Sequence, residues 1–183
     1  MSRDGKQAFL DAIRGGKGFV GMHCATDTFH SKGNSIDPYV EMIGGEFIIH
    51  GDQQKTRILV ADPAFPGAKP FGPSFEILDE WYALMNFPDD LHVILVQDTS
   101  TMKKTGQRGN AAYDRPSFPE TWARMHGKGR VFYTSMGHRE DVWENPLYQG
   151  LLVGALGWVT GQVEASVEPN VAKVTPGYRH IPT

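Results

Sequence analysis

The chain opens with a helical segment that leads within a few residues into a short apolar run, and this pairing constrains the fold most. Residues 3–14 carry apolar side chains at helical spacing, with Ser2 able to cap their start and Gly15-Gly16 able to end them. The run FVGMH (19–23) is typical of a strand buried on both faces. A helix that leads directly into such a strand indicates layered α/β architecture.

Further apolar runs predict the rest of a strand-and-helix scaffold. Strands are expected at 46–50, 56–62, 75–84 and 92–98, with two more joined by a Gly-Lys-Gly turn within 120–138. The remaining helices are expected at 38–43 and 146–159, and a polar, exposed loop at 99–117. Since no repeat or linker divides the chain, we expect one domain over 1–165 and a C-terminal tail over 166–183.

Composition excludes several classes of protein. The 183 residues carry a formal net charge of −3, which leaves no basic surface for nucleic acid. A single cysteine, Cys24, cannot form an internal disulfide. The first residues are polar, unlike a signal peptide, and no apolar run approaches the ~20 residues of a membrane span. We therefore expect a cytoplasmic protein without a nucleic-acid or membrane partner.

Three histidines, His23, His50 and His138, each follow an apolar run. In an open parallel sheet ligands bind at the carboxyl ends of the strands, so we expect these side chains to meet in one crevice. Asp79 and Glu80 can supply carboxylates there. Imidazoles with carboxylates suit zinc or a similar divalent ion, and they equally suit acid–base chemistry near neutral pH. Turn formation alone also favours such residues at strand ends, so a structural role stays open.

Other residues near these histidines have two interpretations each. Glu140 can orient the ring of His138 or cap a helix, and Asp27 can face the crevice or stabilise a turn. Tyr82 and Trp122 can stack on a sugar ring or fill the core. We expect His23, His138 and Glu140 to be catalytic and His23, His50 and His138 to be metal ligands. The expected substrate contacts are Asp27, Asp79, Glu80, Tyr82 and Trp122.

Five segments, taken in order, resemble the trehalose-utilisation (ThuA-like) family. They are GKGFVGMHCATDTF (16–29), YVEMIGGEFIIHG (39–51), FEILDEWYAL (75–84), GKGRVFYTSMGH (127–138) and LYQGLLVGALGWVTG (147–161). The resemblance implies a flavodoxin-like three-layer sandwich with a mostly parallel sheet, as in the class I glutamine-amidotransferase-like superfamily. It also implies a small-molecule carbohydrate partner, such as trehalose or a 3-keto glycoside.

The wider resemblance to amidotransferases argues against glutamine hydrolysis. Those enzymes have a G-x-C elbow after a central strand and a late H-x-E pair. Here the late pair is present as His138-Arg139-Glu140, but the elbow is Gly21-Met22-His23. Cys24 lies one residue further on, where its side chain is directed elsewhere. We therefore expect a sugar-directed hydrolase, lyase or isomerase, or alternatively a non-catalytic carbohydrate-binding module.

The resemblance also implies a strand–helix–strand portion ahead of the first helix, which this sequence lacks. Loss of an inner strand leaves neighbouring strands with unpaired edges. Three explanations stay open: the start of the chain is assigned too late, the gene is a fragment, or another chain completes the sheet. The third makes a homo-oligomer one of the expected states.

Overall fold

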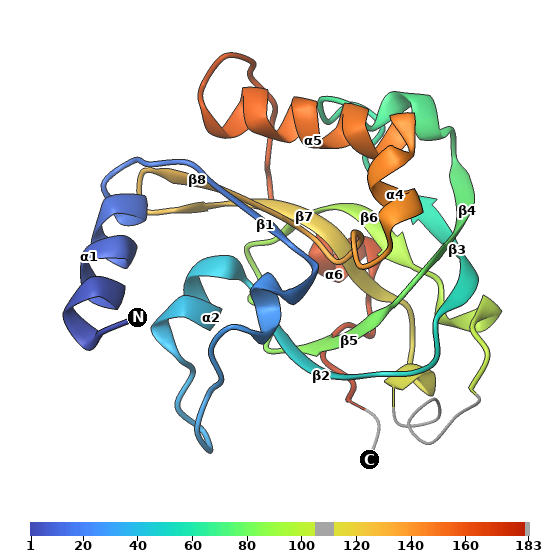
Figure 1. Ribbon diagram of the computed structural model, residues 1–183, viewed down its shortest axis with the longest axis horizontal. Helices are drawn as coiled ribbons and strands as arrows, with labels where there is room; N and C mark the ends of the chain where they lie inside the picture. The colour runs from blue at the N-terminus through green and yellow to red at the C-terminus, as the bar shows by residue number, and fades with distance from the viewer. Residues whose placement is uncertain (105–111, 182–183) are drawn as a thin grey trace.

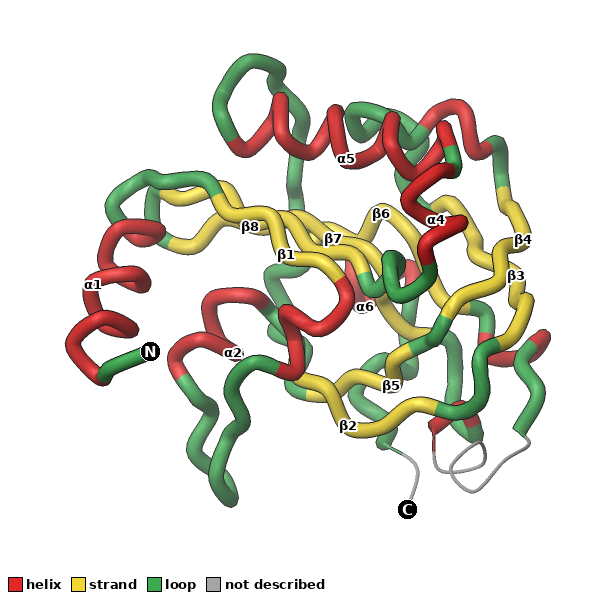
Figure 2. Tube along the Cα trace, in the orientation of Figure 1, coloured by secondary structure: helices red, strands yellow, loops and turns green. Residues whose placement is uncertain are grey.

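The computed structural model describes residues 1–104 and 112–181, so part of the loop expected at 99–117 lies outside it. Its central feature is a curled six-stranded sheet (Figures 1 and 2). The strand order is β1 (Phe19–Met22), β8 (Gly129–Thr134), β7 (Phe118–His126), β6 (His92–Gln97), β3 (Gln54–Val60) and β4 (Ser74–Asp79).

The expectation of a mostly parallel sheet is wrong. Only β1 and β8 pair in parallel, whereas β8–β7, β7–β6, β6–β3 and β3–β4 are antiparallel. For β7 and β8 the reason is local, because the tight turn Gly127-Lys128 joins them and reverses the chain. The flavodoxin-like sandwich is thus not confirmed, but the α/β class is.

The strand expected at 75–84 is two strands. β4 ends at Asp79, and β5 (Tyr82–Met85) pairs with β2 (Glu46–His50) in a separate antiparallel ribbon. The break is fixed at its centre: the Asp79 side chain accepts the Glu80 N–H at 2.9 Å, and the buried Trp81 ring donates to the Gln54 carbonyl at 2.8 Å. Glu80 therefore lies where the chain crosses from one sheet to the other.

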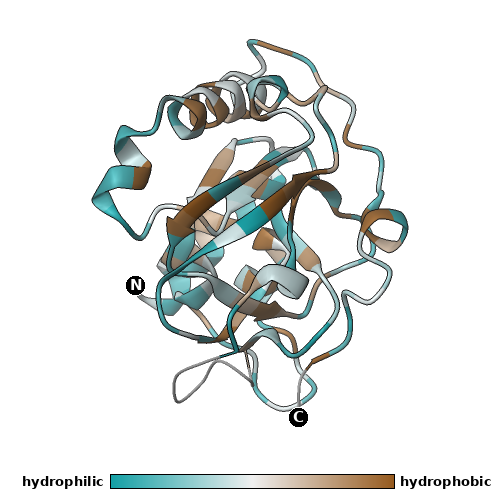
Figure 3. Ribbon diagram, turned by 90° about the vertical axis from the view of Figure 1, so that its right-hand side faces the viewer, coloured by the Kyte–Doolittle hydropathy of each residue, from teal (hydrophilic) through white to brown (hydrophobic). Residues whose placement is uncertain are grey.

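Helices cover both faces of the sheet (Figure 1). α5 (Pro146–Val159) packs on one face, in a core with Phe132 and Ala123, while α1 (Arg3–Arg14) and α2 (Pro38–Ile43) pack on the other with Trp122 and Tyr133. Neighbouring strand residues thus point to opposite cores. In Figure 3 the central strands carry much of the apolar colour, and many of the surrounding loops are hydrophilic.

The helices begin at capping residues, of which the sequence analysis named Ser2. Ser2 accepts the Gly5 N–H at 3.1 Å, Asp37 accepts the Tyr39 N–H at 2.8 Å, and Asn145 accepts the Leu147 N–H at 2.9 Å. Proline occupies the first turn of α2 and of α5. The three helices expected at 3–14, 38–43 and 146–159 are confirmed.

The C-terminal tail packs against the rest of the molecule. It contains α6 (Val171–Val174), and the side chains of Val171 and Tyr178 are buried in the core beneath α1 and α2. The Asn170 side chain accepts the Val93 N–H at 2.7 Å and donates to the Val93 carbonyl at 3.0 Å. Among the described helices, none is long and apolar enough to cross a membrane.

Candidate functional site

His23 stands at a sharp turn directly after β1. It opens the short helix η1 (His23–Asp27) with a φ of 41°, a left-handed conformation that is uncommon outside glycine. Two hydroxyls hold this backbone, because Tyr133 and Thr26 donate to the His23 carbonyl at 2.8 and 3.3 Å. Gly21 makes the turn fit, since a Cβ there would lie 2.9 Å from the Phe19 ring. Strain held in this way is typical of functional sites.

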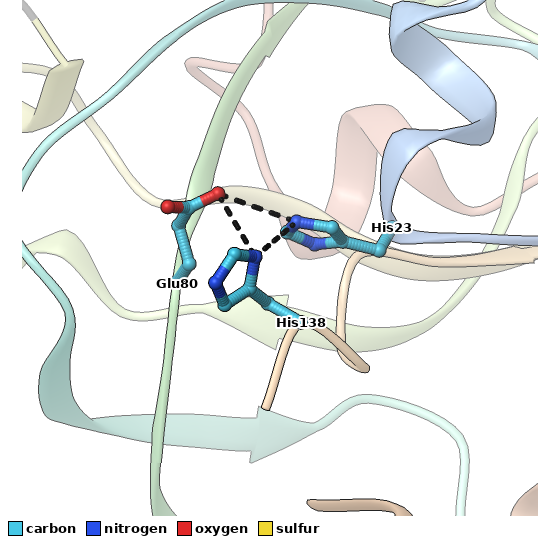
Figure 4. Close-up of side chains that lie close together, drawn as sticks. All are labelled: His23, Glu80 and His138. Carbon is cyan, nitrogen blue, oxygen red and sulfur yellow. Dashed lines mark hydrogen bonds and ion pairs between the residues drawn. The ribbon is translucent and has the colours of Figure 1, made fainter. Parts of the chain in front are cut away.

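The side chains of His23, Glu80 and His138 converge on one point (Figure 4). His23 Nε2 lies 3.3 Å from Glu80 Oε1, His138 Nδ1 lies 3.4 Å from the same oxygen, and the two nitrogens are 3.3 Å apart. The three come from separate segments: the end of β1, the β4–β5 crossing and the loop after β8. The strand-end argument is correct for His23 and His138, because β1 and β8 are the parallel pair.

This triangle has the size that a tetrahedral metal ion requires. Zinc lies about 2.0–2.2 Å from nitrogen and oxygen ligands, and two ligands at a tetrahedral angle are then about 3.3–3.5 Å apart. Two histidines and one carboxylate with an open fourth position also form a known donor set for catalytic zinc. The donor atoms thus fit a divalent ion, and without one the same contacts allow a proton to pass between the rings.

A carbonyl group orients His23 for either role. His23 Nδ1 lies 2.9 Å from the Ser135 carbonyl oxygen, which can only accept, so Nδ1 carries the proton. Nε2 is therefore the ring nitrogen that lies beside Glu80 and His138, and it has a lone pair for a metal ion whenever Nδ1 carries the ring's only proton. Metal-binding histidines commonly have such a partner on the other ring nitrogen.

Asp79 positions the loop that carries His138. Its side chain is fully buried and accepts the Gly137 N–H at 2.8 Å and the Arg139 N–H at 3.2 Å. Burial raises the pKa of Asp79, although these backbone groups, with that of Glu80, stabilise its charged form. Asp79 was expected to contact substrate, and the structure places it beneath the loop instead.

Tyr82 and His50 surround Glu80 from the β2–β5 ribbon. The Tyr82 ring centre lies 4.1 Å from that of His23, and burial together with the Glu80 charge raises the pKa of Tyr82. His50 Nδ1 lies 2.9 Å from the Gly51 carbonyl and 3.3 Å from Glu80 Oε2, the oxygen that does not face the other two histidines. His50, expected as a ligand, is thus placed to support Glu80.

An open cavity of about 370 Å³ adjoins the cluster. It is lined by His138 and by Gln53, Arg139, Glu140 and Asp141. Glu140 is exposed at the start of α4 (Glu140–Glu144), so it faces the space where a ligand would meet His138. Arg139 is held by Asp141 at 2.9 Å and by Gln53 at 2.8 Å.

The remaining expected site residues lie apart from the cluster. Asp27 is at the exposed end of η1, where it pairs with His30 at 3.0 Å. Trp122 is fully buried and donates to the Ile43 carbonyl at 2.8 Å, so it packs in the core. Cys24 is exposed.

Sequence reasoning missed the buried carboxyl group of Glu120, which lies behind the segment that orients His23. This β7 side chain is fully buried and accepts hydrogen bonds from Ser135 Oγ at 2.9 Å, from the Met136 N–H at 3.0 Å and from the Thr134 hydroxyl at 3.2 Å. The sequence feature that could have identified it is a single charged residue in the otherwise uncharged segment FPETWA (118–123), at the start of a strand.

Most of the chain is matched by the model of a known family. The model of the ThuA family, described as "Trehalose utilisation", matches residues 1–159. This chain belongs to the ThuA family. The resemblance drawn from the five sequence segments is therefore confirmed. No curated protein matches the chain.

Solved ThuA-like proteins share this fold. The ThuA-like protein of Bacteroides uniformis is 23% identical with a TM-score of 0.66, over 91% of this chain and 67% of that one. The ThuA-like protein of Parabacteroides merdae is 18% identical with a TM-score of 0.57, over 98% of this chain and 71% of that one. A β-galactosidase from Bacillus circulans is 12% identical with a TM-score of 0.52, over 89% of this chain but only 21% of that one.

Proposed function

We propose that this ThuA-family chain acts on a small carbohydrate or keto-sugar at the cluster of His23, Glu80 and His138. One observation carries the proposal: three potential ligand atoms from three segments lie 3.3–3.4 Å apart beside an open cavity. The description of the family as trehalose utilisation supports a sugar as the substrate class. Hydrolysis, elimination or isomerisation all suit such a site.

In this proposal His23, Glu80 and His138 bind a divalent metal such as zinc. When bound, the ion would polarise a sugar oxygen or favour ionisation of a water molecule. The chain itself supplies orientation: the Ser135 carbonyl fixes the ring of His23, and His50 lies against the second oxygen of Glu80.

Glu140 is the proposed proton carrier of the site. It lines the same cavity as His138, and its exposed carboxylate is free to reach a sugar hydroxyl or a leaving oxygen. Glutamine hydrolysis is not proposed, because His23 occupies the strained elbow position and the exposed Cys24 follows it.

The test is to incubate the protein with a panel of disaccharides and their 3-keto derivatives, with and without added zinc, and to monitor turnover by mass spectrometry. We expect one member to be consumed, with a loss of at least about 10²-fold in His23→Ala and His138→Ala while sugar affinity changes little. A loss of about 10²-fold or more is also expected in Glu140→Gln. Sugar binding without turnover in the wild-type protein would contradict an enzymatic role and support a binding module.

A further inference from the structure

The position of one carbonyl group decides which nitrogen of His23 faces the site. The Ser135 carbonyl accepts from His23 Nδ1 at 2.9 Å, which leaves Nε2 for Glu80 and His138. If residues 134–136 moved by about 1 Å, this hydrogen bond would be lost. The ring could then exchange tautomers and present an N–H to the cluster. The structure that holds residues 134–136 therefore controls the site.

Glu120 holds these residues from inside the protein. Its carboxyl group accepts from Ser135 Oγ, from the Met136 N–H and from the Thr134 hydroxyl, while its own backbone carbonyl accepts the Ser135 N–H at 3.1 Å. Four hydrogen bonds thus join one residue to three consecutive residues. They fix the segment on both sides of the Ser135 carbonyl.

Burying a carboxyl group this deeply costs solvation free energy, so its presence in the core calls for an explanation. Glu120 is 0% exposed, and no ion pair within the described residues includes it. An apolar residue of similar size would fill the same space at lower cost in solvation. Burial raises the pKa of Glu120 to about 7, which is the physical sign of that cost.

We propose that Glu120 is a positioning residue, which holds the Ser135 carbonyl so that His23 keeps its proton on Nδ1 and offers Nε2 to the site. The consequence for metal binding rests on the proposed function, whereas the tautomer is a property of the chain alone. Asp79 has a separate task, since it holds Gly137 and Arg139 on the other half of the loop.

Three variants separate these roles. Glu120→Leu removes every acceptor from the carboxyl position. Glu120→Gln keeps one carbonyl oxygen for the Met136 N–H and Ser135 Oγ, and its amide can donate to Thr121, whose hydroxyl already lies beside the carboxyl group. Asp79→Asn alters the acceptor of the Gly137, Arg139 and Glu80 N–H groups but none of the hydrogen bonds that hold the Ser135 carbonyl, so it is the control for the tautomer of His23.

The experiment is a histidine side-chain ¹H–¹⁵N spectrum of each protein at pH 7.5 without metal, paired with zinc titration calorimetry. We expect a protonated Nδ1 on His23 in the wild type, in Glu120→Gln and in Asp79→Asn. Glu120→Leu should lose this preference and bind zinc about 10–100-fold more weakly. Circular dichroism checks its folding.

Two results would overturn the proposal. The first is a wild-type His23 that carries its proton on Nε2, a measurement that does not depend on the folding of any variant. The second is a Glu120→Leu variant in which the tautomer of His23 and the zinc affinity are both unchanged. A wild-type protein that binds no zinc would contradict the proposed function instead, and the His23 spectrum would still decide the role of Glu120.

Discussion

At the scale of single residues, the candidate site consists of side chains whose chemistry is set by the groups behind them. His23 is oriented by Ser135, Glu80 lies against His50, and the loop of His138 is held by Asp79. The buried carboxyl groups do not themselves face the cavity. They fix the polypeptide that carries the reactive rings, which is how preorganisation is achieved in functional sites.

The buried Glu120 predicts a pH-dependent stability. Because burial raises its pKa to about 7, above the ~4.3 of an unfolded chain, the folded state binds this proton more tightly. Its contribution to the free energy of unfolding is fully present below about pH 4 and is lost as the pH rises through about 7. The loss is on the order of 3 kcal/mol.

Glu120→Gln removes that titration and keeps the shape. We therefore expect the free energy of unfolding of the variant to increase relative to that of the wild type between pH 5 and pH 8, by up to roughly 3 kcal/mol. Urea unfolding of both proteins at the two pH values measures this difference. All other titrating groups are common to both proteins. Equal pH dependence of the two would show that Glu120 stays ionised in the folded protein.

Sequence patterns predicted most of the cluster because its residues stand beside recognisable strands. His23 and His138 were expected as ligands, and Glu80 was expected in the same crevice as a substrate contact, because they follow or interrupt apolar runs. Trp122 and Glu120 could not be assigned in this way. Whether an aromatic ring on a strand faces a ligand or the core, and whether a carboxyl group is solvated, depends on which elements cover that face.

At the scale of elements, close backbone approaches determine how α5 packs. A Cβ at Gly154 would lie 2.1 Å from the Pro66 carbonyl, whereas nothing lies within 4 Å of a Cβ at Gly150. The loop residues Pro66 and Gly67 therefore lie against the α5 backbone at Gly154 and Gly150, but only a Cβ at Gly154 would point into the loop.

These two glycines predict opposite effects of the same substitution. Gly150→Ala should stabilise the protein by up to ~1 kcal/mol, because alanine is the better helix former and meets no neighbour. Gly154→Ala should destabilise it by roughly 1–3 kcal/mol, because the helix must move from the loop. Urea unfolding of both variants measures this, and a stabilised Gly154→Ala would contradict the observed packing of α5.

Strand positions could be predicted from sequence, but strand directions could not. Apolar runs locate buried segments, yet the period of two is the same in parallel and antiparallel sheets. The Gly127-Lys128 turn was the available evidence for an antiparallel pair. The break at Glu80 was also hidden, because the apolar pattern runs on from β4 into β5 while the chain changes sheets.

At the scale of the whole molecule, the tail beyond residue 165 contributes to the core. Burial of Val171 and Tyr178, with the Asn170 bonds to Val93, joins it to the sheet. A chain truncated after Ala165 should lose at least about 3 kcal/mol of unfolding free energy, because two core side chains are removed. Calorimetric melting tests this, and an unchanged melting temperature would mean that the tail is a separate appendage.

The whole fold brings three distant segments to one point, where the side chains of His23, Glu80 and His138 meet. The most direct measurement is zinc binding by calorimetry and elemental mass spectrometry for the wild type, His23→Ala, His138→Ala and the control His180→Ala, which changes an exposed histidine of the tail. We predict about one ion per chain in the wild type and the control, and affinity at least about 100-fold weaker in the other two. No binding by the wild type, or undiminished binding by His23→Ala, would show that the cluster of His23, Glu80 and His138 does not bind zinc.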